Sequence, residues 1–258
     1  MAPKKSTAKS TAPSPLKSAA KAVVAPKDPK PATEKSATEK SATEEPKAEK
    51  TAVTAVVEKV EEPKVPPVWP RKIDFKALAD EVKLAASWDR TALVVCNGKA
   101  KEADTFFTYS GHAQIDAKWV LAETAIKKTM SVEEMQEDLR RRVVGAMKHG
   151  LPVHVAMANS AVSFKEKFCS EKGLPACFFK VKEFKGETEK DVKDRPYRKM
   201  VKDEDLKDWP GMPGYIKEGF HVVVTTDFSM ENCKEFLTDA LPFLEDMAII
   251  EIDLASFT

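Results

Sequence analysis

The sequence predicts an α/β fold in which a mainly parallel sheet of four to five strands is sandwiched by helices. Short, almost continuously apolar segments of the kind found in fully covered strands occur at residues 92–97, 152–157, 220–226 and 247–252. Segments with helical periodicity lie between them, so strands and helices alternate along the chain. Parallel strands need such crossover connections, and the alternation therefore favours a parallel sheet with helices on both faces.

The clearest predicted helix covers residues 132–149. Ser131 and Glu134 have the spacing of a capping box, and Gly150 follows the last turn. The apolar residues of this segment recur every three or four positions, which predicts that one face packs onto the sheet. The three consecutive arginines at residues 140–142 are expected on a partly solvated face of the helix.

Other elements follow from shorter signals. Asp74 is expected to cap a helix that runs to about Trp88. Alternate residues of segment 114–121 are apolar, which predicts a short strand or extended stretch there. Further helices are predicted at residues 101–109, 163–170 and 230–240.

The first 66 residues are predicted to form a disordered, low-complexity tail. They contain no aromatic residue and no glycine, and they are rich in lysine, alanine, proline, threonine and serine. Such a composition cannot bury enough apolar surface to offset the chain entropy that folding removes. The tail (residues 1–66) carries thirteen lysines against nine acidic residues, and its first 27 residues carry six lysines and no acid. This charge favours attraction to a polyanion, and the alternative is a solvated spacer with no dedicated partner.

The folded domain is predicted to cover residues 67–258 and to begin where consecutive prolines give way to Trp69. Because the whole chain has a net charge of +1, the domain itself carries a small negative net charge, which argues against nucleic-acid binding by the folded part. Its regular pattern is interrupted at about residues 184–219, where charged residues and turn-forming prolines and glycines gather. We expect a long excursion at the edge of the sheet there.

The four cysteines and four histidines lack metal-binding spacings. No C-x-x-C pair occurs and no two histidines stand four residues apart, so no metal is predicted and the cysteines are expected to be reduced thiols. Cys169 with His154 and Asn159 is one candidate nucleophile set, and the favoured alternative is a buried, inert thiol. No apolar run has the length of a membrane span, so no membrane partner is predicted.

A phosphate-binding loop is incomplete where this fold would place one. Gly98, Lys99 and Lys101 follow the strand at 92–97 and lie at the start of the next helix. A working loop has the pattern G-x-x-x-x-G-K-[S/T], because two glycines let backbone N–H groups surround the phosphates. No second glycine precedes the helix here. We therefore interpret these three residues as a vestigial cofactor-binding position, and no cofactor is predicted.

The order of these features resembles a known family. A strand, a broken loop, a helix, an Arg-rich helix that ends in Gly150-Leu151-Pro152-Val153 and the strand at 220–226 are similar to the degenerate fifth AAA+ module of dynein heavy chains. They are equally similar to the dynein-like C-terminal domain of proteins with IQ motifs and ankyrin repeats. The likeness covers about residues 90–255. It implies a P-loop NTPase-like fold of the AAA+ type whose nucleotide chemistry is vestigial.

Carried over residue by residue, the resemblance puts residues 96–104 at the Walker A position and residues 156–160 at the Walker B position. Asn159 and Ser160 stand where a Walker B strand should end in acidic residues that hold Mg²⁺ and orient water. Thr226, with its neighbours on either side, matches the place of a polar sensor. The alternative is that these residues only end a strand and cap the helix that follows.

Three functions follow from these interpretations. The favoured one is a non-catalytic AAA+-like interaction or structural module, cytoplasmic and in a cilium or on the cytoskeleton, with microtubule or axonemal protein partners reached through the tail. The first alternative is a nuclear protein that binds nucleic acid or chromatin through residues 1–66. The second is an atypical nucleotide-binding enzyme in which Lys99 or Lys101 holds a phosphate of ATP at a helix N-terminus. The incomplete Walker motifs argue against enzymatic activity.

Overall fold

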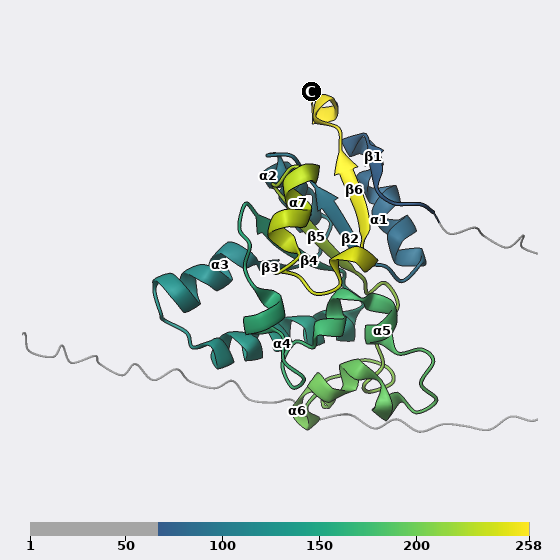
Figure 1. Ribbon diagram of the computed structural model, residues 1–258. Coiled ribbons are helices and arrows are strands. Elements are labelled where there is room, and N and C mark those ends of the chain that lie inside the picture. Colours follow the sequence, from purple (N-terminus) through teal and green to yellow (C-terminus); the bar gives the residue numbers. More distant parts are fainter. Residues whose placement is uncertain (1–66, 258) are drawn as a thin grey trace, which may run out of the picture. The chain divides into compact units, whose positions relative to one another are not determined.

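A six-stranded, all-parallel sheet forms the centre of the computed structural model, which describes residues 67–257 (Figure 1). The strands in chain order are β1 (Arg71–Ile73), β2 (Ala92–Val95), β3 (Ala113–Asp116), β4 (Val153–Ala158), β5 (Val222–Thr226) and β6 (Ala248–Ile252). Within the sheet they stand in the order β1-β6-β2-β5-β4-β3, and every neighbouring pair is parallel. The predicted parallel sheet is confirmed. The tail predicted at residues 1–66 lies outside the described residues.

The number of strands exceeds the four or five expected. β2, β4 and β5 are almost wholly buried, as continuous apolar strands covered on both faces should be. The strand that the sequence did not reveal is β1, which is three residues long and pairs with β6 at the edge of the sheet. A segment this short shows no periodicity that could be recognised beforehand.

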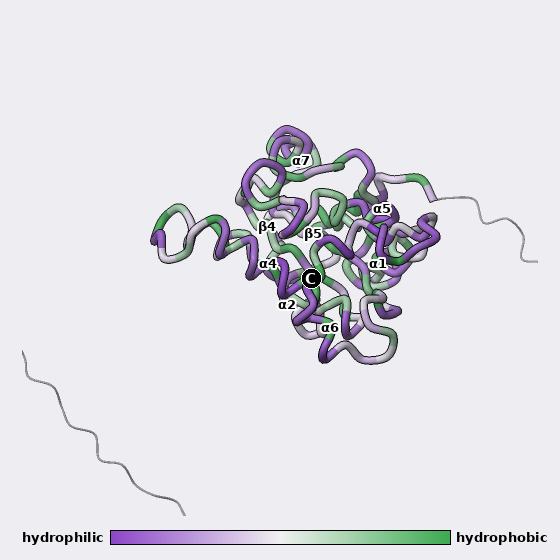
Figure 2. Tube along the Cα trace, turned by 90° about the horizontal axis from the view of Figure 1, so that it is seen from below, coloured by the Kyte–Doolittle hydropathy of each residue, from purple (hydrophilic) through white to green (hydrophobic). Residues whose placement is uncertain are grey.

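Helices cover both faces of the sheet and enclose two separate apolar clusters. The longer helices are α1 (Leu78–Ser87), α2 (Ala100–Tyr109), α3 (Ala117–Leu121), α4 (Val132–His149) and α7 (Met230–Leu237). α1 and α2 contribute to the cluster on one face, while α3, α4 and α7 contribute to the cluster on the other. Figure 2 shows hydrophobic colour concentrated on the central strands and hydrophilic colour on much of the helical periphery. The predicted helix–sheet–helix sandwich is confirmed.

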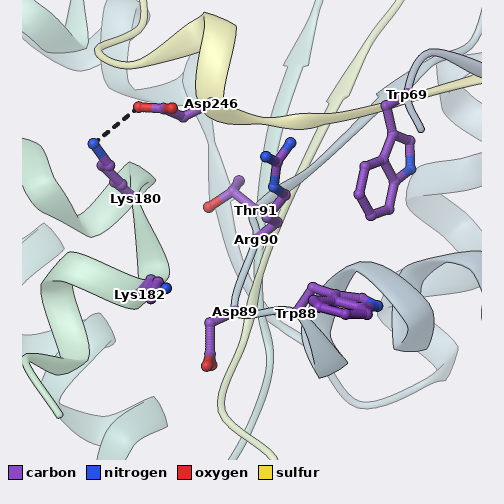
Figure 3. Close-up of a pocket in the computed structure, with 8 residues that line it drawn as sticks. All are labelled: Trp69, Trp88, Asp89, Arg90, Thr91, Lys180, Lys182 and Asp246. Atoms are coloured by element: carbon purple, nitrogen blue, oxygen red, sulfur yellow. Dashed lines mark ion pairs between the residues drawn. The ribbon is translucent and has the colours of Figure 1, made fainter. Parts of the chain in front are cut away.

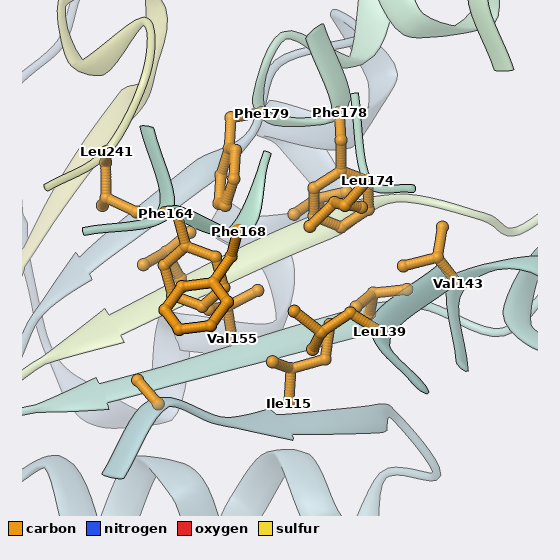
Figure 4. Packing of buried hydrophobic residues seen from close by; sticks show 14 of the residues in the cluster. Ile115, Leu139, Val143, Val155, Phe164, Phe168, Leu174, Phe178, Phe179 and Leu241 are labelled. Carbon is orange, nitrogen blue, oxygen red and sulfur yellow. The ribbon is translucent and has the colours of Figure 1, made fainter. Parts of the chain in front are cut away.

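The larger of the two clusters contains several phenylalanines that pack against one another (Figure 4). The rings of Phe164 and Phe179 pack edge to face with their centroids 5.7 Å apart, and those of Phe178 and Phe184 do the same at 5.7 Å. Such pairs stabilise a core beyond the area that they bury. All four belong to the connection between β4 and β5, so this connection is part of the core.

The predicted helix at 132–149 is confirmed as α4, together with its caps. The Ser131 hydroxyl accepts a hydrogen bond from the Glu134 N–H at 3.1 Å, and the Glu134 carboxylate accepts one from the Ser131 N–H at 2.8 Å. Gly150 ends the helix with a φ of 67°, which favours glycine. A Cβ atom there would lie 2.1 Å from the Glu218 carbonyl oxygen, so this close approach of two backbones also requires glycine.

The strand expected at 114–121 is wrong in its second half. β3 ends at Asp116, whose carboxylate accepts hydrogen bonds from the N–H groups of Lys118 at 2.8 Å and Trp119 at 3.2 Å. This cap starts α3, in which Ala117 and Val120 are buried at helical spacing. A local side-chain cap therefore outweighs the alternating apolar pattern.

Three predicted helices appear with changed bounds. Asp74 is an N-cap as expected, but it caps a 3-10 turn at Phe75–Ala77 that leads into α1. The segment expected at 163–170 is a single π-helical turn, Phe164–Phe168, capped by Ser163. The helix expected at 230–240 ends earlier, at Leu237, and its cap is Ser229.

One arginine of the run 140–142 departs from the expected solvated face. Arg140 is fully buried, with 0% of its surface exposed, whereas Arg141 and Arg142 are exposed. Its guanidinium donates to the Glu137 carboxylate at 2.9 Å, to the Met200 carbonyl oxygen at 2.9 Å and to Asp205. Arg140 thus joins α4 to the segment that the sequence treats as an excursion.

That segment, residues 184–219, is called the insertion below. It consists of short turns and of α6 (Asp203–Leu206), and it follows α5 (Val181–Lys185). Tyr197, Met200 and Trp209 are buried in it. Its backbone is joined to α4 by a 3.0 Å hydrogen bond from the Lys217 N–H to the Met147 carbonyl oxygen. The insertion therefore packs on α4 and leads along the chain into the central strand β5. The expectation that it lies along an edge of the sheet is wrong.

Candidate functional site

The loop between β2 and α2 lies at the carboxyl end of the sheet, where open parallel α/β sheets bind ligands. The structure brings Gly98, Lys99 and Thr226 to this end of β2 and β5. Gly98 has a φ of 87°, and its N–H donates to the Asp227 carbonyl oxygen at 3.0 Å. The loop is thereby tied to the end of β5.

The N-terminus of α2 is already occupied by an anion from the chain itself. The Asp227 carboxylate accepts a 2.7 Å hydrogen bond from the Ala100 N–H, in the first turn of α2. A phosphate would bind at such a helix end, because the free N–H groups and the helix dipole favour negative charge. Asp227 supplies that charge from within. The sequence placed Asp227 at the end of β5 but gave no sign that it reaches across to α2.

The two candidate lysines do not converge on the helix end. The Lys99 ammonium lies 3.5 Å from the Glu102 carboxylate, three residues along the same chain segment. Lys101 is exposed and forms no ion pair with any residue of the described part. Neither lysine is held over the loop in the way that a phosphate-binding lysine would be.

Three of the four charged residues that line the space beside the loop are acidic. A cavity of about 580 Å³ opens next to Gly98 and is lined by Asp227, Glu251, Asp253 and a single cation, Lys72, among others. Carboxylates at this density repel a polyphosphate. The shape of a ligand-sized space is therefore present, but its electrostatics oppose the ligand that the fold suggests.

Thr226 does not present a free hydroxyl to this cavity. The residue is fully buried, and its hydroxyl donates to the Ala158 carbonyl oxygen at 3.2 Å and accepts from the Phe228 N–H at 3.3 Å. These bonds fasten the ends of β4 and β5 to each other. The alternative role as a cap of the following helix is also wrong, because Ser229 caps α7.

The end of β4 carries no carboxylate at the Walker B position. Ala158 has a φ of 48° and closes the strand. The Ser160 hydroxyl donates back to the Met157 carbonyl oxygen at 2.6 Å, so it is engaged in a local turn. Residues 156–160 therefore hold no acidic side chain that could bind Mg²⁺ or orient water.

A polar cluster beneath the loop has no local signal in the sequence. The Thr225 hydroxyl donates to the Asp104 carboxylate at 2.7 Å, and His154 Nε2 lies 2.9 Å from the same hydroxyl oxygen and 3.2 Å from Asp104 Oδ1. Because Thr225 gives its only hydroxyl proton to Asp104, His154 must carry its proton on Nε2 and donate it. The cluster joins α2 to β4 and β5. Only the parallel register, which no single segment reveals, brings its three members together.

This cluster lacks the geometry of a catalytic triad. In a triad the carboxylate binds one ring nitrogen of histidine and the nucleophile binds the other. Here Asp104 and Thr225 both face Nε2, while the Nδ1 atom of His154 is buried without a hydrogen-bond partner in the described part. The arrangement positions α2, and it does not place a histidine between the carboxylate and the hydroxyl as a triad does.

The nucleophile set considered from the sequence is not assembled either. His154 packs against Phe107 of α2, whereas Cys169 packs against the cluster on the opposite face of the sheet. Burial raises the pKa of the Cys169 thiol to about 12 and that of Cys177 to about 11. All four cysteines are free, as expected, and the shifted pKa values favour unreactive thiols.

A second, smaller cavity lies at the other end of β2 (Figure 3). It measures about 240 Å³. The Arg90 guanidinium stands over the Trp69 ring at 5.3 Å, and Lys180 pairs with Asp246 at 3.1 Å. Arg90, Lys180 and Asp246 thus contact partners within the wall. The place of this cavity at the amino ends of the strands is not where parallel sheets bind ligands.

Within residues 67–257 no three His, Cys, Asp or Glu side chains are grouped so that they could hold a metal ion. The same part of the chain contains no helix with the length and hydropathy of a membrane span. Comparisons with protein-family models, with curated proteins and with solved structures give no match to this chain.

Proposed function

We propose that the chain is a degenerate AAA+-type domain that has lost nucleotide chemistry and serves as an interaction or structural module. The strand order supports the fold assignment, since β5 with the sensor position lies between β2 and β4, which carry the Walker A and Walker B positions.

The observation that carries the proposal is the Asp227 carboxylate on the Ala100 N–H, 2.7 Å away. A phosphate at the start of α2 would have to displace this carboxylate and then face Glu251 and Asp253 in the adjoining cavity. Loss of the Walker B carboxylate removes the Mg²⁺ that would otherwise screen this repulsion. Binding and hydrolysis of a nucleoside triphosphate are both disfavoured for the same electrostatic reason.

Titration of the full-length chain with labelled ATP and GTP in the presence of Mg²⁺ tests the loss of nucleotide binding. We expect no saturable binding at micromolar concentrations for the wild-type chain or for Lys99→Ala. Asp227→Ala removes the internal anion, and Ser229→Ala is the matched control because it changes a neighbouring residue of the same cavity whose hydroxyl caps α7. Micromolar binding by the wild-type chain that Lys99→Ala abolishes would overturn the proposal.

The partner that we propose is an acidic protein surface of the cytoskeleton, such as the tubulin tails of a microtubule or axoneme, attracted by the lysines of the tail. Cosedimentation of the full-length chain with microtubules is compared with a variant in which the six lysines of residues 1–27 are changed to glutamine. Lysine-dependent, salt-sensitive sedimentation supports this partner. Retention on DNA without sedimentation on microtubules would favour the nuclear alternative.

A further inference from the structure

The insertion contains two neighbouring cavities that share Tyr215 as a wall. The first, of about 300 Å³, is lined among others by Lys185, Arg195, Tyr197 and Lys217. It is called the insertion cavity below. The second, of about 510 Å³, lies on the other side of Tyr215 and includes Arg198 in its wall. These volumes suit a small ligand or one side chain of a larger one.

Polar groups in and beside the insertion cavity are buried without partners. Tyr197 is only 1% exposed, and its hydroxyl has no hydrogen-bond partner in the described part of the chain. The same holds for Arg195 Nε and Arg198 Nη1. Arg195 lies close enough to Tyr197 to oppose the rise in its pKa that burial causes, but the two side chains lack the geometry of a hydrogen bond. Each unsatisfied buried donor destabilises the fold, so three together call for an explanation.

Residues 214 and 215 lie close to these two arginines. Gly214 has a φ of 82°, and a Cβ atom on it would lie 2.5 Å from Arg198 Nη1. Arg195 lies over the Tyr215 ring with 6.0 Å between the guanidinium carbon and the ring centroid. Both guanidinium groups are therefore oriented before any ligand arrives, which lowers the entropy lost on binding.

Cations outnumber acids around the two cavities. The walls include the cations Lys185, Lys190, Lys193, Arg195, Arg198 and Lys217 against the acids Glu187, Asp191 and Glu218. Of these cations only Lys185 has an ion pair with another described residue, its partner being Asp89. The other five cations have no ion pair with a described residue, and they exceed the three acids in the walls, so the two cavities together carry a net positive charge.

We propose that the insertion cavity binds a phosphate monoester group, with Arg195, Tyr197 and Lys217 as donors to its oxygens and with the rest of the ligand extending past Tyr215 toward Arg198. A planar guanidinium pairs with phosphate through two parallel hydrogen bonds, and a neutral tyrosine hydroxyl donates a third. Glu187 and Glu218 offset two of the three cations of the insertion cavity itself, so the excess positive charge that favours a dianion over a single carboxylate comes mainly from the neighbouring wall with Arg198. This site is separate from the loop at Gly98 and does not depend on the proposed loss of nucleotide chemistry.

Calorimetric titration of the full-length chain with inorganic phosphate at constant ionic strength tests the site. We expect Tyr197→Phe and Arg195→Gln each to weaken phosphate binding about tenfold or more, because each removes a hydrogen bond to a charged group. The matched controls are Tyr109→Phe and Arg141→Gln, which change exposed residues and should bind phosphate as the wild-type chain does. Unfolding curves of the four variants establish that each is folded.

Two further arms distinguish the source of the phosphate group. Ribose 5-phosphate represents a small metabolite and a phosphoserine peptide represents a modified protein, and tighter binding of either than of inorganic phosphate identifies the source. The proposal fails if the wild-type chain binds none of the three probes, or if Tyr197→Phe only stabilises the fold and leaves phosphate affinity unchanged. It also fails if Lys99→Ala abolishes phosphate binding while Arg195→Gln does not. That last result would place the anion at α2 and contradict the proposed function as well.

Discussion

The loop at Gly98 and the insertion differ in their capacity to bind a negatively charged group. At the loop, where the fold suggests a phosphate site, the start of α2 is satisfied by Asp227 and the adjoining cavity is lined by carboxylates. In the insertion, where no motif points to a ligand, Arg195 and Tyr197 retain buried donors without partners. The position of a motif and the capacity to bind an anion are therefore separate properties, and the second depends on which charges the fold leaves unpaired.

The two regions also differ in how they are held. The loop is part of the parallel sheet and is fastened by the buried Asp104–Thr225–His154 cluster. The insertion is made of short turns and depends on one side chain, Arg140, for much of its polar attachment to α4. Substitutions in the two attachments should thus separate the stability of the sheet from that of the insertion.

The largest effect is expected from Arg140→Ala. This change leaves the Met200 carbonyl oxygen and the Asp205 carboxylate without their buried donor, and breaking such a pair costs about 3–5 kcal/mol. Chemical denaturation measures the loss in the free energy of unfolding. Arg141→Ala, one residue along the same helix, removes only an exposed pair with Glu137 and should cost less than about 1 kcal/mol. Equal costs for the two variants would mean that Arg140 does not hold the insertion.

The same network should make the stability of the wild-type chain sensitive to acid. Hydrogen bonds from Arg140 hold the pKa of Glu137 at about 2, and Arg140 also opposes the effect of burial to lower the pKa of Asp205. A carboxyl group with a depressed pKa stabilises the fold above its unfolded pKa, and this contribution is lost as the pH falls through the folded value. The free energy of unfolding of the wild-type chain should therefore fall as the pH is lowered from 5 to about 2, and it should fall less in Arg140→Ala. Unfolding curves measured across this pH range test the difference.

The next effect concerns the attachment beneath the loop. Asp104→Ala removes the acceptor of the buried Thr225 hydroxyl and the carboxylate beside His154, at a cost of about 1.5–3 kcal/mol. The matched control is Glu102→Ala on the same helix, where the acid forms only an exposed pair with Lys99. Thr225→Val combined with Asp104→Ala should cost less than the sum of the single changes, because both partners are then removed. Strict additivity would show that the two groups are not coupled.

Most of the fold could be predicted because its signals are local. The capping box at Ser131 and the glycine at Gly150 fix α4, and continuous apolar runs mark the buried strands. The errors come from elements with weak local signals. β1 has only three residues, and Asp116 redirects an alternating segment into α3. The buried position of Arg140 depends on a segment sixty residues further along, which no local pattern contains.

The sites were less predictable because their chemistry depends on pairs that are distant in the sequence. The position of Gly98 and the lack of a second glycine were visible, but the bond from Ala100 to Asp227 spans 127 residues. Likewise the composition of the insertion showed that it is charged, but not which cations are paired. Only the structure shows that Arg195 Nε and the Tyr197 hydroxyl are buried donors without a hydrogen-bond partner in the described part of the chain.

A pH-dependent effect is expected at the junction between the two regions. Burial lowers the pKa of His112 to about 4, and the ring of His221, which leads from the insertion into β5, lies 5.8 Å from it. Below pH 6.5 the unfolded chain binds a proton that the folded chain does not bind until about pH 4, so stability falls over this range. After allowance for solvent screening of the partly exposed ring, the loss is on the order of 2 kcal/mol. Unfolding curves of His112→Phe should be flatter there. His149→Gln alters an exposed histidine and should keep the wild-type slope.

The smallest effect concerns the internal anion itself. Asp227→Ala leaves the Ala100 N–H without its acceptor and should cost about 1 kcal/mol, as the loss of a helix cap does. Ser229→Ala removes the cap of α7 and should cost a similar amount, while Asp227→Asn keeps an acceptor oxygen and should cost less than Asp227→Ala. Thermal unfolding of the three variants measures these differences. If Asp227→Ala is more stable than the wild-type chain, the carboxylate is destabilised by Glu251 and Asp253 and does not serve as the cap of α2. The loop and the insertion would then differ only in the charge of their cavities, because in neither region would an anion of the chain stabilise the anion-binding position.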